Sequence, residues 1–188
     1  MQGMPAVEIQ ASGAPGMSPA RRPLAAAVTV AAVGAATILG AYFFQYVMGL
    51  PPCPLCLEQR IAYYVSIPLA VVLALAAARH ATPRLVALGL GVIALAMLFN
   101  AGLSIFHAGI EWKWWPGPQE CSGPLGDLSA GGDLLSQLGS VTLVRCDEAA
   151  WRLLGISLAG YDVVISLALS AIAAWGAVAA AHRSRPIP

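Results

Sequence analysis

The sequence predicts an all-α integral membrane protein, a bundle of four helices with two loops on the outer side of the membrane. Of its 188 residues, 59% are hydrophobic and only 10% are charged, and the mean hydropathy is +0.74. A soluble domain carries roughly 25% charged residues. Four apolar segments are each long enough to cross a bilayer, because about 20 helical residues span its hydrocarbon core. The net charge of +1 gives no indication of nucleic-acid binding.

The predicted spans cover residues 24–50, 61–78, 85–110 and 153–181. Backbone groups inside a bilayer must be hydrogen-bonded within the spanning structure, and these runs are too continuous for barrel strands, so helices are expected. Residues 1–20 are rich in Ala, Gly and Pro and are expected to form a flexible cytoplasmic tail. Residues 21–188 are expected to form one four-span domain. The first span starts too late and runs too long for a cleaved signal peptide.

Basic residues predict the orientation of the bundle. With four spans, both termini share one side of the membrane with the loop between spans two and three. That side carries six basic residues against four on the other, which places both termini in the cytoplasm. The six are Arg21, Arg22, Arg79, Arg84, Arg183 and Arg185, and the four are Arg60, Lys113, Arg145 and Arg152.

All four cysteines then fall on the outer side, and none is expected inside a membrane helix. Cys53 and Cys56 lie in the first outer loop, and Cys121 and Cys146 lie in the long loop between spans three and four. Thiols outside the cytoplasm tend to pair. The arrangement predicts one disulfide per loop, although four cysteines allow three connectivities.

The short spacing of Cys53 and Cys56 favours a redox role over a structural one. A disulfide across two residues closes a very small ring and stabilises little, and strained or exposed disulfides are the more easily reduced kind. Two structural staples remain an alternative, and so does a zinc site. Zinc is disfavoured because the second pair is widely spaced and an oxidising compartment works against free thiolates, so we expect no metal.

The sequence around Cys56 predicts an activated thiol. Pro54 precedes it and indicates that the second helix starts close by, and Arg60 follows four residues later on the same helical face. The partial positive charge of a helix N-terminus and a nearby cation both lower the pKa of a thiol. We therefore expect a Cys56 thiolate at the bilayer surface, where an acceptor dissolved in the membrane can approach it.

Three motifs carry a resemblance to a known family: "CPLCLEQR", "HAGIEWKWWPGPQECSG" and "RCDEAAWRLLGISLAGY". With four spans and two outer cysteine pairs, the chain resembles the bacterial disulfide bond formation protein B (DsbB) family from the first span to the last. The resemblance implies an inner-membrane protein with periplasmic cysteine loops. Its implied activity is to reoxidise a periplasmic thioredoxin-like oxidase (DsbA) and pass the electrons to a membrane quinone, either ubiquinone or menaquinone.

The resemblance also implies residue roles. Cys121 matches the cysteine that forms the mixed disulfide with the partner, and Cys146 matches its mate. Electrons would pass to Cys53 and Cys56 through a Cys53–Cys146 link, and Cys56 would reduce the quinone. Arg60 and His107 match residues at the quinone site, although a lone histidine near the end of a span is more often an interfacial hydrogen-bonding residue.

Two other functions stay open from the sequence. One is a scaffold protein with disulfide-stapled loops. The other is a quinone-linked oxidoreductase of the vitamin K epoxide reductase type, in which the paired cysteines lie late in the bundle rather than before the second span.

Further residues give weaker predictions. Trp112, Trp114, Trp115 and Trp151 suggest an aromatic belt at the membrane interface, and they could also shape the mouth of a quinone site. Asp162 lies inside an apolar run and is expected to hydrogen-bond or to pair with Arg60. The leucines at 134, 135 and 138 have helical spacing, which suggests a short helix lying on the membrane.

Overall fold

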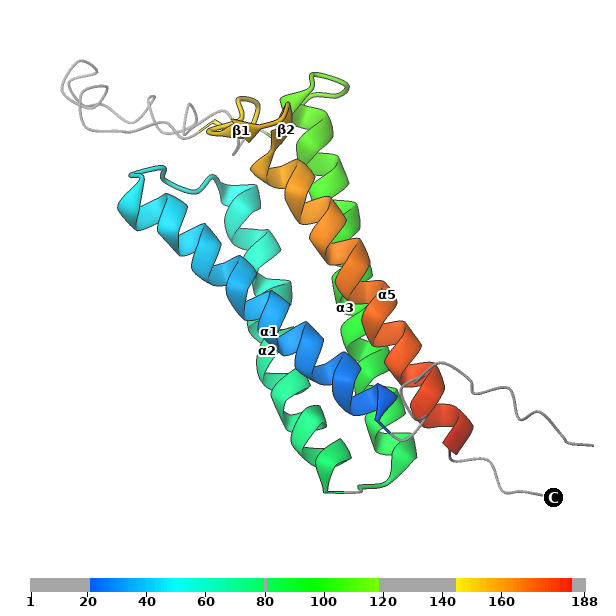
Figure 1. Cartoon of the computed structure of the whole chain (residues 1–188). Helices are drawn as coiled ribbons and strands as arrows, with labels where there is room; N and C mark the ends of the chain where they lie inside the picture. Colours follow the sequence, from blue (N-terminus) through cyan, green and yellow to red (C-terminus); the bar gives the residue numbers. More distant parts are fainter. Residues whose placement is uncertain (1–20, 80, 119–144, 184–188) are drawn as a thin grey trace, which may run out of the picture.

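The computed structural model describes residues 21–79, 81–118 and 145–183, and these contain four long helices (Figure 1). The helices are α1 (Arg22–Tyr42, continued by the π-helix η1, Phe43–Val47), α2 (Pro54–Ala78), α3 (Pro83–Glu111) and α5 (Leu158–Arg183). All four are long and apolar enough to cross a membrane. The predicted all-α membrane bundle is therefore confirmed. The N-terminal tail, Cys121 and the leucine-rich segment at 134–138 lie outside the described residues.

Prolines mark the starts of the first three helices. Pro23, Pro54 and Pro83 all occupy first-turn positions, where the missing N–H costs nothing and the fixed φ suits the helix. Helix α2 therefore begins seven residues before the apolar run at 61–78, because its first turns carry polar side chains that hydropathy excludes. Cys56 lies in the first turn of α2, so the expectation that no cysteine would lie in a membrane helix was wrong.

The fourth helix begins later than predicted because residues 152–157 form a small hairpin. Strands β1 (Arg152–Leu153) and β2 (Ile156–Ser157) pair antiparallel. The two residues between them, Leu154 and Gly155, both have positive φ, at 52° and 82°. This is the conformation of a type I′ turn, whose twist matches that of paired strands. The hairpin shows that the apolar run starting at residue 153 is not helical throughout.

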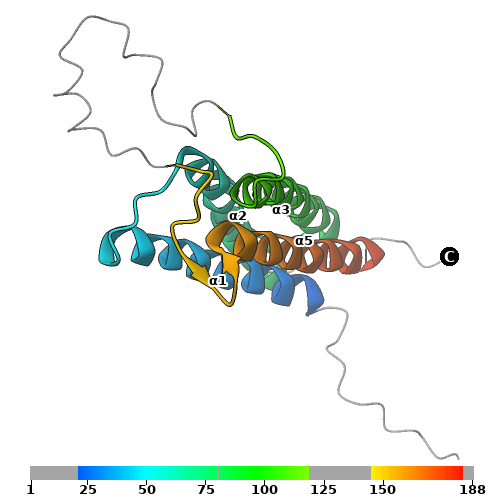
Figure 2. The same ribbon diagram turned by 90° about the horizontal axis from the view of Figure 1, so that it is seen from above.

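The four helices pack mainly as two pairs, α1 with α2 and α3 with α5 (Figures 1 and 2). Leu90, Ile93 and Met97 of α3 and Leu169 and Ala173 of α5 are buried between them. Small residues let the helices approach closely. A Cβ added to Gly176 would lie 2.5 Å from the Cβ of Ala26. Such contacts are typical of membrane helices, which gain little from the hydrophobic effect when they associate.

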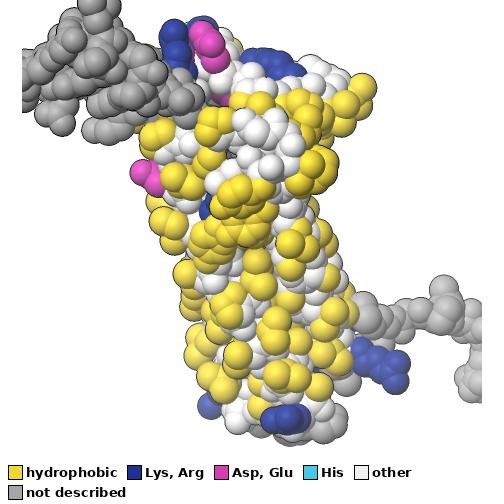
Figure 3. Space-filling model, turned by 90° about the vertical axis from the view of Figure 1, so that its left-hand side faces the viewer, with side chains coloured by type: hydrophobic (Ala, Val, Ile, Leu, Met, Phe, Trp, Pro, Cys, Tyr) yellow, Lys and Arg dark blue, Asp and Glu magenta, His cyan; other side chains and the backbone are white. Residues whose placement is uncertain are grey.

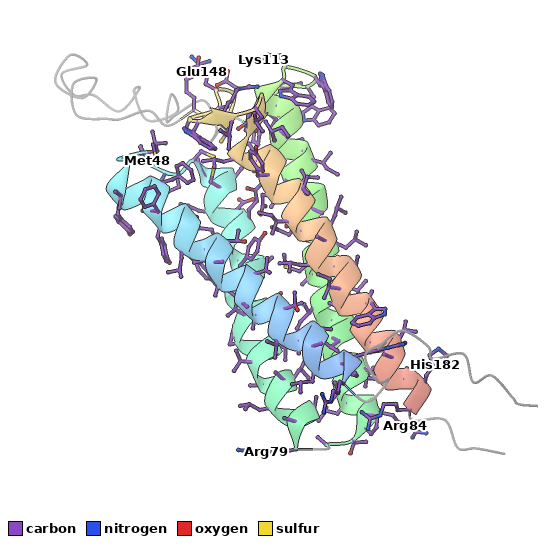
Figure 4. The ribbon with its side chains drawn as sticks, viewed as in Figure 1. Met48, Arg79, Arg84, Lys113, Glu148 and His182 are labelled. Atoms are coloured by element: carbon purple, nitrogen blue, oxygen red, sulfur yellow. The ribbon has the colours of Figure 1, made fainter. Side chains whose placement is uncertain are left out.

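The surface separates into an apolar band and two charged ends. Figure 3 shows hydrophobic side chains along the middle of the molecule and basic or acidic side chains gathered near its ends. Arg79, Arg84 and His182 lie at one end, and Lys113 and Glu148 lie at the other (Figure 4). This distribution, with apolar side chains along the helices and charged side chains near the helix ends, is the one expected of a four-span membrane protein. Which end faces the cytoplasm stays a prediction.

Candidate redox site

Cys53 caps the first turn of α2. Its backbone is extended, with φ −74° and ψ 166°, and its Sγ accepts a hydrogen bond from the backbone amide of Cys56 at 3.3 Å. Both thiols are free, and their sulfur atoms lie 2.8 Å apart. A disulfide bond is about 2.05 Å long. The capped turn therefore holds the two sulfurs close to bonding distance.

The structure corrects the expected position of the thiolate. A hydrogen bond from Cys56, and then one from His107, lowers the pKa of Cys53 to about 5 against the opposing effect of burial. Cys53 gains from the helix start because, as the capping residue, it presents its sulfur to a free amide of the first turn. The lowered pKa therefore belongs to the capping sulfur, Cys53.

Cys146 lies beside Cys53 although 93 residues separate them in sequence. Its side chain is buried, and its sulfur belongs to a disulfide whose other half lies outside the described residues. The Sγ atoms of Cys53 and Cys146 and a ring nitrogen of His107 all lie within 4.8 Å of one another. This donor set would suit a soft metal, but the disulfide at Cys146 leaves only two of the three ligands free.

His107 reaches this sulfur cluster from α3. The imidazole is buried, with Nε2 3.6 Å from Cys53 Sγ and Nδ1 3.4 Å from Nε2 of Gln59. The carboxylate of Glu111, one turn later, lies 3.9 Å from Nε2. Gln59 and Glu111 were not identified from the sequence. Their positions, three residues after Cys56 and four after His107, were the available signals.

A cavity of about 390 Å³ opens beside the cysteine pair. Helices α1, α2 and α5 and the segment before β1 enclose it, and most of its lining is apolar. The side chains with polar atoms include Cys56, Gln59, Arg60, Tyr63 and Asp162. The structure therefore places two predicted site residues, Cys56 and Arg60, on one cavity. His107, predicted at the same site, does not line it.

Arg60 is held by the π-helix that ends the first span. Its Nη1 donates to Oε1 of Gln45 at 2.6 Å, and its guanidinium lies 5.5 Å from the ring centre of Tyr42. A π-helix inserts a residue into the helical repeat and is often found at functional sites. Of the two alternatives expected for Asp162, hydrogen bonding and pairing with Arg60, the structure shows the first. Among the described residues, Arg60 contacts Gln45 and Tyr42 instead.

Asp162 instead joins three helices below the cysteines. Its carboxylate accepts hydrogen bonds from Tyr63 of α2 and from Asn100 and Ser104 of α3. Ser166, one turn later on α5, accepts from Asn100 at 3.0 Å. Three donors stabilise a carboxylate that would be costly to bury alone in a bilayer. Asp162 therefore both lines the cavity and connects α5 to its neighbours.

The tryptophans divide into two groups. Trp112, Trp114 and Trp115 contact one another at the end of α3, with ring centres 4.8 and 5.9 Å apart in successive pairs. Trp151 lines the cavity and packs on Phe44, with ring centres 4.9 Å apart. Trp151 thus shapes the cavity wall, while the belt interpretation of the other three stays a prediction.

Ion pairs hold the segment that carries Cys146. Asp147 accepts from Lys113, which follows α3, at 2.6 Å and from Arg145 at 2.7 and 2.9 Å. These cations lower the pKa of Asp147 well below that of an ordinary carboxyl. Because the folded pKa is depressed, the stabilisation is present above the ordinary carboxyl pKa of about 3.9 and is lost as the pH falls below it.

We expect Asp147→Asn to slow disulfide formation between Cys53 and Cys146 several-fold, because Lys113 would no longer tie the Cys146 segment to the end of α3. The rate can be followed by quenched thiol alkylation and intact mass in a Cys56→Ser background. Raised salt should slow the parent and leave Asp147→Asn almost unchanged, since exposed ion pairs are screened. Equal rates and equal salt dependence would show that the ion pairs do not position Cys146. Glu148→Gln serves as the matched control, because Glu148 is more exposed and lies 3.6 Å from Arg145.

Fold and site together define a class: a multi-pass membrane protein in which a cysteine pair at a helix start meets a disulfide from a distant loop. The family model described as "Disulfide bond formation protein DsbB" matches residues 22–176. The chain belongs to the DsbB family, and it is therefore a membrane oxidoreductase of disulfide bond formation.

Curated relatives agree with this assignment. The chain is 32% identical to disulfide bond formation protein B of Verminephrobacter eiseniae over 161 residues, which cover 78% of this chain and 82% of the relative. It is 32% identical to the protein of the same name from Saccharophagus degradans, with 73% and 82% covered. Disulfide bond formation protein B 2 of Pseudomonas syringae is also 32% identical, with 72% and 77% covered. No solved structure matches the chain significantly.

Proposed function

We propose that this chain reoxidises a periplasmic thioredoxin-like oxidase of the DsbA type and transfers the electrons to a membrane quinone. One observation supports the proposal most strongly: Cys53 Sγ has two neighbouring sulfurs with different surroundings. Cys56 is 2.8 Å away and lines the apolar cavity. The disulfide-bonded Cys146 is within 4.8 Å and belongs to the segment before β1. Cys53 can therefore exchange bonds with either sulfur.

The proposed relay consists of thiol–disulfide exchanges. A thiolate of the partner attacks Cys121, and the bonding electron pair leaves on Cys146. Cys146 then attacks Cys53 of the Cys53–Cys56 disulfide and releases Cys56 as the thiolate. The partner and the loop pair return to their disulfide forms as the remaining bonds resolve. Over one cycle the partner loses two electrons and two protons, and one quinone gains them.

The cavity suits a quinone ring. Its volume of about 390 Å³ falls within the range of small-molecule sites, and its apolar lining with few polar groups is the usual composition of such sites. Cys56 and Arg60 lie one helical turn apart on its wall, so a ring beside Cys56 can present a carbonyl oxygen to the guanidinium. When bound, the quinone supplies the electron acceptor. The residues around it orient the ring and exclude water.

Arg60 is proposed to bind a quinone carbonyl, with Gln45 holding the guanidinium in place. We expect Arg60→Met to raise the KM for a soluble quinone at least tenfold, because a charged hydrogen bond in a buried site contributes about 1.5–3 kcal/mol. Gln45→Leu should raise it less, since the charge remains. The measurement is quinone-dependent turnover at saturating reduced partner. An unchanged KM in Arg60→Met would remove Arg60 from the quinone site.

We also propose that the cysteine end of the bundle faces the periplasm and that both termini are cytoplasmic, in a bacterial inner membrane. The support is the distribution of basic residues, six against four, together with the requirement of the relay for an oxidising compartment. Labelling single cysteines introduced at Arg79 and Lys113 with an impermeant reagent in intact spheroplasts tests this orientation. Labelling of the first position and protection of the second would reverse it.

The function is tested with the purified full chain in detergent. Reduced thioredoxin-like partner and a soluble quinone are added, and quinone absorbance is followed. We expect stoichiometric oxidation of the partner and reduction of the quinone by the unmodified chain. Cys146→Ser should abolish partner-driven turnover but allow the Cys53–Cys56 pair to reduce quinone when a small dithiol replaces the partner. Full partner-driven turnover in Cys146→Ser would exclude the relay.

A further inference from the structure

His107 has a defined tautomer because of Gln59. The amide nitrogen of Gln59 lies 3.4 Å from Nδ1 of the imidazole, and an amide nitrogen can only donate. Nδ1 is therefore the acceptor, and in the neutral ring the proton is on Nε2. Both side chains are almost fully buried, at 6% and 2% exposure, so water does not compete for this bond. The tautomer leaves an N–H donor on the opposite side of the ring.

That donor is directed at a sulfur atom. His107 Nε2 lies 3.6 Å from Cys53 Sγ. The same sulfur accepts from the amide of Cys56, so two N–H groups from different helices converge on it. His107 does not line the cavity that would hold the quinone, whereas Gln59 and Cys56 do. The contacts of His107 thus belong to the sulfur exchange rather than to the cavity.

We propose that His107 is a catalytic residue of the disulfide exchange: its Nε2–H stabilises Cys53 as the leaving and attacking sulfur, and Gln59 is the positioning residue that fixes the tautomer. The inference rests on the proposed relay and assigns a role within it. The chemical partner of this histidine is a thiolate of the protein itself, not a quinone oxygen.

The step is an exchange of sulfur bonds. In a Cys53–Cys146 disulfide, an incoming thiolate attacks Cys146. A new bond forms to Cys146, the Cys53–Cys146 bond breaks, and the electron pair remains on Cys53 Sγ. The Nε2–H of His107 donates to that negative charge without transferring its proton. Closing the Cys53–Cys56 disulfide then removes two electrons from the reduced pair, and the quinone of the proposed function would accept them with two protons. A sulfur stabilised as a thiolate leaves faster, because exchange rates depend on the leaving group.

Other charged or titratable groups also act at this position. The Cys56 sulfur of α2 lies 2.8 Å from that of Cys53, Glu111 lies 3.9 Å from His107 on α3, and Asp162 of α5 influences His107 at longer range. Arg152 acts on Glu111 from β1. A change in Cys53 titration must therefore be compared between variants that leave these groups in place.

The first test titrates Cys53 directly. In a Cys121→Ser, Cys146→Ser background, only Cys53 and Cys56 carry thiols, and thiolate ultraviolet absorbance is followed against pH in the full chain. The first apparent pKa, assigned to Cys53, is expected at about 5. His107→Leu should raise it by at least about one unit, and His107→Gln, which keeps an N–H donor, should fall between the two. His182→Gln is the control for loss of a histidine elsewhere. An unchanged first pKa in His107→Leu would overturn the proposal.

The second test separates exchange from quinone binding. With reduced partner and soluble quinone, His107→Leu should lower kcat about tenfold and leave the quinone KM within about twofold. A raised KM with unchanged kcat would place His107 at the quinone instead and overturn the proposal. If the unmodified chain does not turn over at all, the proposed function fails, while the Cys53 titration still decides the role of His107.

Gln59→Met provides an independent variant if His107→Leu does not fold. It removes the donor to Nδ1 and keeps the imidazole and a similar side-chain volume. With its tautomer no longer fixed, His107 should donate less to Cys53, and the first thiol pKa should rise by less than in His107→Leu. A first pKa identical to that of the parent would show that Gln59 does not position His107.

Discussion

Replacing Cys56 with serine is expected to abolish quinone reduction and to leave a stable disulfide between Cys53 and Cys146. Cys56 is the sulfur of the pair that lines the cavity. Without it, Cys53 keeps Cys146 within 4.8 Å but cannot close the cavity-side ring. Quinone absorbance should show no turnover above the uncatalysed rate, and peptide mapping under non-reducing conditions should identify the Cys53–Cys146 link.

The neighbouring Leu57, which is 49% exposed, supplies a control. Leu57→Ala should keep turnover within about twofold, because it removes no group from the cavity or the sulfur cluster. Full quinone reduction by Cys56→Ser would contradict the proposed relay. Turnover lost without the Cys53–Cys146 link would keep the role of Cys56 but exclude this intermediate.

Replacing Asp162 with alanine is expected to destabilise the bundle by about 2–4 kcal/mol. The change removes three hydrogen bonds to one carboxylate, from Tyr63, Asn100 and Ser104. Hydrogen bonds to charged groups contribute about 1.5–3 kcal/mol each, with smaller values typical inside membranes. The three donors keep second acceptors in Ser166 and in the backbone carbonyl of Asn100, which limits the loss. The free energy of unfolding can be measured by denaturant titration in mixed micelles.

Two further variants separate stability from chemistry at this position. Ser170→Ala removes a single hydrogen bond to the carbonyl of Ala94 and should cost no more than about 1 kcal/mol. Asp162→Asn keeps the shape and one acceptor, so it should fold and retain quinone reduction. A large loss of turnover by folded Asp162→Asn would give the carboxylate a part in the chemistry. An unfolding free energy unchanged in Asp162→Ala would show that the network is not structural.

Hydropathy predicted the four helices because the bilayer requires long apolar segments with internally satisfied backbones. It misplaced two boundaries. Helix α2 begins at Pro54, but its first two turns contain polar residues such as Glu58 and Arg60, so hydropathy excluded them from the predicted span. Before α5, Leu153 and Ile156 are apolar but belong to a hairpin, and only the glycine at 155 gives a local sign of the turn.

The sequence predicted the paired cysteines and Arg60 as site residues because CxxC spacing and an i, i+4 relation depend on local geometry. It could not place Cys146 beside Cys53, which requires the packing of distant segments; the resemblance alone implied that link. Its preference for a Cys56 thiolate is not supported, because the lowered pKa is that of Cys53. Helical position alone favoured Cys56 as the thiolate. In the structure, the sulfur of Cys53 accepts the hydrogen bond from the backbone amide of Cys56 and lies beside His107 of α3.

The low pKa of Cys53 bears on the driving force of the proposed relay. Stabilising the thiolate stabilises the reduced pair and makes its disulfide a stronger oxidant, which helps it accept electrons from an oxidising partner. Because the folded pKa is depressed, this advantage is complete above the ordinary thiol pKa of about 8.5 and is lost as the pH falls through about 5.

Divalent sulfur makes only one disulfide at a time, and Cys53 has two neighbours that could share it. While it is joined to Cys146 it cannot be joined to Cys56, so the outward-facing and lipid-facing halves of the cycle must alternate. The sulfur of Cys53 thereby separates the two halves of the cycle. Reducing equivalents arrive from the loop when Cys53 is bonded to Cys146, and they leave toward the bilayer when Cys53 bonds to Cys56.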